Sequence, residues 1–355
     1  MSMTNIPFRK SLKDISWQVD EGTYRDDKAL SYSTLSTFLK GGFNCLDHLF
    51  DKKESPSLTF GSAVDALITG GDEEFNNKFL VADFPDVQEA IVKIVKECFD
   101  RYHITHKSLL DIPDSSIAGI ALEVGFQNNW KPETKARVVK EKGEEYYNLL
   151  HLAENKIILS NSVYLDVLNC VKALKESDAT RFYFAANNPF DNTIERFYQL
   201  KFKTTLNGIE YRCMADLLIV DHEKKEITPV DLKTSSHPEW DFYYSFITWN
   251  YQIQARLYWR IIRNIMDMDP YFKDFVLNDY KFIVVNKETL TPLVWEFSYT
   301  QSVGELLLGK TSQIAMKDPE DIGKELHEYL KEVHAVPNNI QVDKPNNLVN
   351  WIDSL

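Results

Sequence analysis

Residues 194–235 constrain the fold more than any other part of the chain, because apolar and polar side chains alternate there with a period of two. Such alternation is typical of strands with one buried face and does not fit a helix, whose period is 3.6. Turn signals interrupt the run at 206–208, which contains an Asn-Gly pair, and at 221–225. An Asn-Gly pair between alternating segments is a strong hairpin signal. The segment therefore predicts three consecutive antiparallel strands.

The second turn determines which residues of its hairpin face each other. Asp216 and Asp231 lie equally far from its midpoint, which falls between Glu223 and Lys224. Directly opposed residues hold their Cβ atoms about 4.5–5.5 Å apart, where like charges repel. Lys233 lies on the same strand face as Asp231, because side chains alternate. The register predicts a cluster of three ionisable groups, unless a one-residue slip turns an aspartate to solvent.

The surroundings of this cluster are apolar, and unpaired carboxylates are costly in such a place. A divalent cation would resolve the repulsion, and two carboxylates with several waters and a phosphate match what Mg²⁺ prefers. We therefore expect a magnesium site. The apolar neighbours are Met214, Ala215, Leu217, Leu218, Val230 and Leu232.

The rest of the chain mixes helical and strand patterns. Residues 243–266 predict one long helix, and strands are expected at 281–287 and 292–298, followed by charged helices. From 87 to about 184 nearly everything has a helical period, and a serine-capped helix is expected near Ser33. The predicted class is α/β, with a central mixed sheet flanked by helices and an added helical lobe.

Charge, cysteine spacing and hydropathy exclude several classes of protein. The 53 acidic and 40 basic residues give a net charge of −13, which disfavours a protein that coats nucleic acid. The four cysteines form no CxxC pair, so no zinc or iron–sulfur site is expected. Apolar runs stay short of the roughly 18–20 residues that cross a bilayer, and the N-terminal stretch does not resemble a signal peptide. We therefore expect a cytoplasmic protein without membrane contact.

One segment, 131–142, is rich in basic residues and includes Lys135, Arg137 and Lys140. It could focus positive potential into a groove that accepts a polyanion. A solvated helix face with ion pairs four residues apart explains the same pattern equally well.

Two motifs together resemble the PD-(D/E)XK nucleases. Asp216, followed after fourteen positions by the Asp-Leu-Lys-Thr sequence at 231–234, is similar to the core of that superfamily. Gln254 and Tyr258 form the QxxxY motif of its RecB-type exonuclease branch, and at this spacing they share one helix face. The combination is more specific than either motif alone.

The order of the motifs is most similar to phage and prophage exonucleases like exodeoxyribonuclease VIII, and the resemblance covers about 30–75 and 130–300. It implies a restriction-endonuclease-like core. The expected division is an N-terminal extension (1–30), the first helical part of the core (31–75), a helical insertion (76–190), the core sheet with the QxxxY helix (191–300) and C-terminal helices (301–355).

The resemblance also implies a role for individual residues. Asp65 ends the sequence Gly-Ser-Ala-Val-Asp, where the family usually has the histidine of a GxxxH motif. A carboxylate at this position could still bind a metal ion. The alternative is that Asp65 is only a polar residue near the end of a helix. The resemblance implies that Asp216, Asp231 and Lys233 are catalytic and that the metal ligands are Asp65, Asp216, Asp231 and the Leu232 carbonyl. It implies DNA contacts from Gln254, Tyr258, Lys135, Arg137 and Lys140. Glu195 and Thr234 are expected to support the site from beside it.

The implied activity is Mg²⁺-dependent hydrolysis of DNA phosphodiesters, with Mn²⁺ as a substitute metal, by an exonuclease of phage-type recombination or DNA processing. The implied partners are DNA, a single-strand annealing protein and further copies of the chain. Two alternatives stay open: a nucleic-acid-binding or assembly module with weak or absent catalysis, and a metal-dependent hydrolase of small phosphates.

Overall fold

The computed structural model describes residues 9–51, 55–298, 307–308, 312–313 and 318–335. The chain divides into two compact units, one formed by 1–57 with 170–355 and the other by 58–169. This division differs from the expected boundaries, because 58–75 belongs with the helical unit and 170–190 with the sheet.

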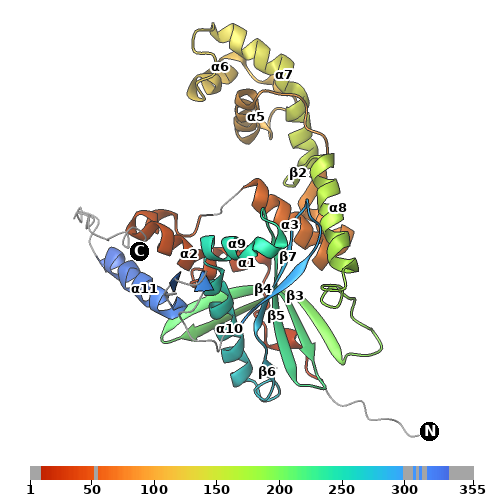
Figure 1. The fold of residues 1–355 in the computed structure, drawn as a ribbon. Helices are drawn as coiled ribbons and strands as arrows, with labels where there is room; N and C mark the ends of the chain where they lie inside the picture. The colour runs from red at the N-terminus through yellow and green to blue at the C-terminus, as the bar shows by residue number, and fades with distance from the viewer. Residues whose placement is uncertain (1–8, 52–54, 299–306, 309–311, 314–317, 336–355) are drawn as a thin grey trace. The chain divides into compact units, whose positions relative to one another are not determined.

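The first unit is built on a six-stranded mixed sheet in the order β3-β4-β5-β7-β8, with β6 beside the start of β5 (Figure 1). β3, β4 and β5 are antiparallel neighbours, β7 runs parallel to β5, and β8 is antiparallel to β7. The expected mixed sheet and its first three strands are therefore confirmed. The strands are β3 (Ile194–Leu206), β4 (Ile209–Asp221), β5 (Glu226–Thr234), β6 (Val276–Leu277), β7 (Tyr280–Val285) and β8 (Leu293–Phe297).

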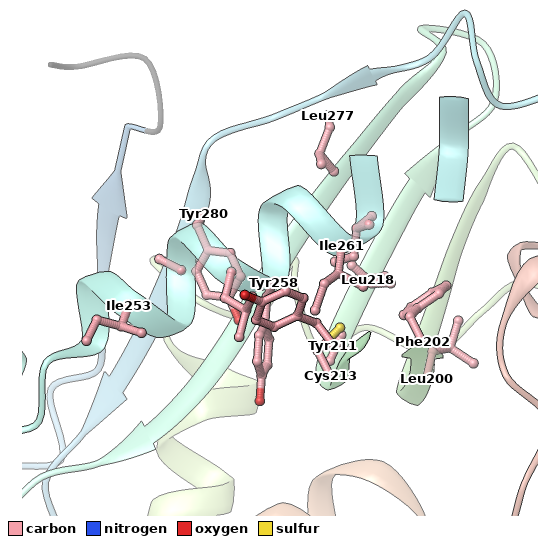
Figure 2. Packing of buried hydrophobic residues seen from close by; sticks show 14 of the residues in the cluster. Leu200, Phe202, Tyr211, Cys213, Leu218, Ile253, Tyr258, Ile261, Leu277 and Tyr280 are labelled. Carbon is pink, nitrogen blue, oxygen red and sulfur yellow. The ribbon is translucent and has the colours of Figure 1, made fainter. Parts of the chain in front are cut away.

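Helix α10 packs against β3 and β4, with α2 and α11 beside it. Figure 2 shows side chains of α10 meeting those of the sheet in the main hydrophobic core. The helices of this unit are η1 (Leu12–Ile15), α1 (Glu21–Asp26), α2 (Tyr32–Gly41), η2 (Gly42–His48), η4 (Glu239–Asp241), α9 (Phe242–Thr248), α10 (Tyr251–Met268) and α11 (Pro319–Ala335), with short strands β9 (Leu307–Leu308) and β10 (Ser312–Gln313).

Local chemistry explains where these elements begin and end. The β3–β4 turn uses Asn207 and Gly208, both with positive φ, as the Asn-Gly signal predicts. A capping box between Ser31 and Thr34 starts α2. The single long helix expected at 243–266 is wrong: Asn250 adopts the left-handed conformation, with φ 56°, and this residue separates α9 from α10.

The second unit is mainly helical and has its own core. The prediction of nearly continuous helix is wrong at one place, because β2 pairs with β1 in a small parallel sheet. The elements are α3 (Pro56–Thr69), α4 (Gly71–Lys78), β1 (Phe79–Val81), α5 (Glu89–Tyr102), η3 (Leu109–Asp111), α6 (Asp114–Glu123), α7 (Pro132–Ala153), β2 (Ile157–Leu159) and α8 (Asn161–Glu176), which continues into the first unit. Of the expected C-terminal helices, α11 is present, and 336–355 lie outside the described residues. No helix in the described part of the chain is long and apolar enough to span a membrane.

Candidate active site

The site lies where β4 and β5 separate. Their pairing runs from Asp221 opposite Glu226 to Leu217 opposite Val230, which confirms the predicted register and excludes the one-residue slip. Beyond that pair, β4 continues along β3 and β5 continues along β7. The next opposed positions are those of Asp216 and Asp231, so the two carboxylates stand at the opening between the strands.

Asp216 bridges this opening through its side chain. Its Oδ2 accepts a hydrogen bond from the backbone N–H of Leu232 at 3.0 Å. In a strand, the N–H and C=O of one residue point to the same side. The Leu232 carbonyl therefore also faces the gap between β4 and β5. The carboxylate oxygens and this carbonyl are the kind of ligands that a hard cation takes.

Asp231 is almost completely buried, with 1% of its side chain exposed. Its Oδ2 lies 2.5 Å from the Nζ of Lys233, and its Oδ1 accepts a hydrogen bond from Nε2 of Gln254 on α10 at 2.5 Å. The ion pair and the hydrogen bond compensate for the loss of hydration that burial imposes on a carboxylate. The structure thus brings together Asp216, Asp231, Lys233 and Gln254.

Lys233 remains protonated at neutral pH. Burial by itself lowers the pKa of this amine, but the charges of Asp231 and Asp216 outweigh burial and raise the pKa above its ordinary value. Its Nζ also lies 4.6 Å from the ring centre of Tyr251, where a cation–π contact favours the charged form. Two carboxylates and one ammonium leave a net charge of −1, which a cation or a proton would balance.

Tyr258 lies one turn beyond Gln254 on α10 and is 8% exposed. Burial raises its pKa well above 10. Figure 2 shows it beside Tyr280 of β7, and the two ring centres are 6.4 Å apart. These surroundings are those of a side chain that packs the helix against the sheet, and the contact of Tyr258 with DNA stays a prediction.

Glu195 and Thr234 do not join the four-residue cluster. Glu195 Oε2 lies 2.8 Å from Nε2 of His222, and His222 Nδ1 lies 3.0 Å from the Tyr271 hydroxyl. Glu195 is opposite Val220 on β4, four positions beyond Asp216, so it is about 13 Å away along the strand. Thr234 pairs with Val285 in the β5–β7 ladder.

The remaining predicted site residues belong to the second unit. Asp65 is half-buried on α3, and its role as a metal ligand stays a prediction. On α7, Arg137 pairs with Glu141 at 2.9 Å and Lys140 pairs with Asp114 at 2.7 Å, while Lys135 is buried. The Arg137–Glu141 pair agrees with the alternative of a solvated helix face, whereas Lys140 pairs with a residue of α6 and the buried Lys135 does not belong to such a face.

The cluster offers few protein ligands to a metal ion. In the described ranges, no three or more His, Cys, Asp or Glu side chains lie close enough to hold a metal ion together. Mg²⁺ retains several waters and commonly takes only one or two protein carboxylates with a substrate phosphate. Asp216, Asp231 and the Leu232 carbonyl fit such a site in number and in kind.

Two features of the site were not anticipated from the sequence. Tyr251 forms part of the site, where its ring lies against the Lys233 ammonium. The sequence could have indicated this, because Tyr251 is three residues from Gln254 and therefore shares its helix face. Gln199, on β3 between the Tyr198–Leu217 and Leu200–Ala215 pairs, has a φ of 53°. Such a value is strained for a residue other than glycine, and no sequence signal marks it.

Comparisons with known proteins give little further information. No family model and no curated protein matches the chain. Among solved structures, the chain is similar to a protein of Eubacterium rectale that is provisionally named an exonuclease, with 12% identity and a TM-score of 0.43 over 96% of this chain and 100% of that one. Similarity at this level assigns no function.

Proposed function

We propose that the protein is a metal-dependent deoxyribonuclease of the PD-(D/E)XK type, acting as an exonuclease in DNA processing. The observation that carries the proposal is the convergence of Asp216, Asp231 and Lys233 where β4 and β5 separate. Two carboxylates and a charged lysine at such an opening fit the hydrolysis of a phosphodiester, whose transition state gains negative charge.

Each residue of the cluster would have a distinct part. Lys233, whose pKa the charge of Asp231 raises in the metal-free protein, would stabilise the negative charge on the phosphoryl oxygens. Gln254 holds Asp231 in orientation through its hydrogen bond. Asp216, Asp231 and the Leu232 carbonyl would hold Mg²⁺, which, when bound, lowers the pKa of a water and neutralises the leaving oxygen.

A second candidate is a DNA-binding module with weak catalysis. It is favoured by the crowding of Asp231, since both its oxygens have a partner at 2.5 Å within the protein. The aspartate at position 65, in place of the usual histidine, points the same way. The two candidates differ only in turnover, so one experiment separates them.

The test compares linear duplex, closed circular and single-stranded DNA, each with Mg²⁺, with Mn²⁺ and with EDTA. An exonuclease degrades the linear DNA with metal, leaves the closed circle intact and stops in EDTA. Binding of DNA without degradation of any form under all three conditions would support the second candidate and overturn the first.

A further inference from the structure

The segment between β5 and α10 presents aromatic rings to solvent. Trp240 is 55% exposed, and Tyr244 and Trp249 are each 50% exposed. His237 is also exposed, with its ring centre 5.7 Å from that of Tyr244. We call these four residues the aromatic platform. The other exposed side chains of 235–250 are serine and threonine, so this surface offers flat rings rather than aliphatic groups.

The platform is held firmly by the residues beneath it. Glu239 is fully buried and accepts hydrogen bonds from the backbone N–H groups of Asn286 and Thr291 at 3.0 and 2.9 Å. Trp295 Nε1 donates to the Glu239 carbonyl. Phe242, also buried, stacks on Tyr251 with ring centres 5.8 Å apart. Half-exposed rings on a fixed backbone lose little conformational entropy when they bind a flat ligand.

Trp249 is the platform residue that a short chain of contacts connects to the carboxylate cluster. The Trp249 carbonyl accepts a hydrogen bond from the Tyr32 hydroxyl at 2.5 Å. The rings of Tyr32 and Tyr251 are 6.2 Å apart, and Tyr251 lies against the ammonium of Lys233. Lys40 Nζ lies 4.2 Å from the ring centre of Trp249, which places positive charge beside an exposed ring.

From this arrangement we infer that the aromatic platform binds unpaired bases of the DNA strand whose backbone passes the Asp231–Lys233 pair. In naming DNA, the inference rests on the proposed function. Aromatic side chains stack with bases of any sequence, and a neighbouring cation contacts the backbone. Paired bases hide their faces in the duplex stack, so the platform would bind a single strand or a frayed end.

The test measures binding in EDTA, where no cleavage interferes. The probes are a fluorescent oligothymidylate and a strand of the same length with abasic sites, which keeps the phosphates and removes the base faces. We expect wild type to bind the base-containing strand at least about 5-fold more tightly. Trp240→Ala with Trp249→Ala should weaken that binding by about 5- to 100-fold and leave the abasic strand nearly unaffected.

Matched variants control for folding and for exposure. Trp240→Phe with Trp249→Phe should retain most of the preference, because a phenyl ring still stacks. Phe190→Ala removes a 97% exposed ring on the loop before β3 and should change nothing. The alanine variants should melt within a few degrees of wild type, since their rings are half-exposed.

Equal binding of the two strands by wild type would overturn the inference, even if the protein degrades DNA. Self-association of wild type that is lost in the alanine variants would also overturn it, because a second copy would then occupy the platform. A clear preference for bases without any Mg²⁺-dependent cleavage would support the platform and contradict the proposed nuclease.

Discussion

The side-chain amide of Gln254 on α10 donates a hydrogen bond to Oδ1 of Asp231 on β5 across 2.5 Å. Both residues are buried, so this bond joins the helix that covers the sheet to the carboxylate at its centre. Position 254 was expected to contact DNA, and the structure gives its Nε2 a partner within the protein.

Gln254→Ala should destabilise the protein by about 1–3 kcal/mol, because Oδ1 of a buried carboxylate loses its donor. If Gln254 orients Asp231, kcat for DNA should also fall, whereas loss of a phosphate contact alone would raise KM. Urea unfolding and steady-state kinetics measure the two effects. The control is Gln252→Ala on the same helix, where Gln252 makes a longer hydrogen bond of 3.3 Å to Asn250. This variant should lower the free energy of unfolding by less than Gln254→Ala. An unchanged kcat with a raised KM would return Gln254 to the role of a phosphate contact.

Lys233→Met should destabilise the metal-free protein by about 3 kcal/mol, because it leaves Asp231 buried beside Asp216 without a counter-charge. Mg²⁺ should then raise the melting temperature of the variant more than that of wild type, since a cation that binds the folded state stabilises it. Thermal melts with Mg²⁺ and with EDTA test this. No shift with Mg²⁺ or Mn²⁺ in either protein would argue against a metal at these carboxylates.

The pH dependence of this ion pair follows from the raised pKa of Lys233. The contribution of the ion pair to the free energy of unfolding is complete below the unfolded lysine pKa of about 10.4. It is lost only as the pH rises through the higher pKa of Lys233 in the folded protein. The difference in unfolding free energy between wild type and Lys233→Met should therefore stay constant from about pH 6 to 9. A difference that shrinks across this range would mean that Lys233 loses its proton there.

Asp318→Asn should weaken the attachment of α11. Arg260 donates to both carboxylate oxygens of Asp318 at 2.6 Å. Burial raises the pKa of Asp318, but these hydrogen bonds outweigh burial and lower the pKa below 3.8. The pair contributes stability above that unfolded value and loses it as the pH falls through the folded value. The variant should be less stable by about 1–3 kcal/mol at pH 7, and this deficit should be smaller near pH 3. An equal deficit at both pH values would exclude the ion pair as its cause.

The basic segment of α7 can be tested through the salt dependence of DNA binding. Each neutralised phosphate contributes about −0.9 to the slope of log affinity against log salt. Because Arg137 and Lys140 are already paired, replacing them and Lys135 by glutamine should change the slope by less than about one. Lys93→Gln, which breaks a comparable pair with Glu89, is the control. A slope flattened by two or more would place this segment on the DNA path.

The β4–β5 hairpin could be predicted from the sequence because a two-residue period and the turn signal at 221–225 are both local signals. Its register follows from the turn, and the structure places Leu217 opposite Val230 as that register requires. The juxtaposition of Asp216 and Asp231 was predictable for the same reason.

What the sequence did not predict depends on tertiary contacts. Asn250 adopts the left-handed conformation and separates α9 from α10 within a sequence whose pattern is otherwise helical. The sequence pattern alone does not indicate this break. Similarly, the Glu195 side chain could face either a carboxylate or His222, and alternation along β3 does not distinguish the two. Side-chain partners across separate elements depend on the assembled fold.

The central claim is that Asp216 acts in Mg²⁺-dependent cleavage of DNA, and Asp216→Asn tests it most directly. The asparagine oxygen can still accept from the Leu232 N–H, so the variant should fold and melt like wild type. Asp221→Asn is the matched control on the same strand, where the carboxylate accepts from the backbone of Glu223 and Lys224. We predict that Asp216→Asn degrades linear DNA at least about 100-fold more slowly than wild type with Mg²⁺ and that Asp221→Asn retains the wild-type rate. Wild-type degradation by a folded Asp216→Asn protein would contradict the account.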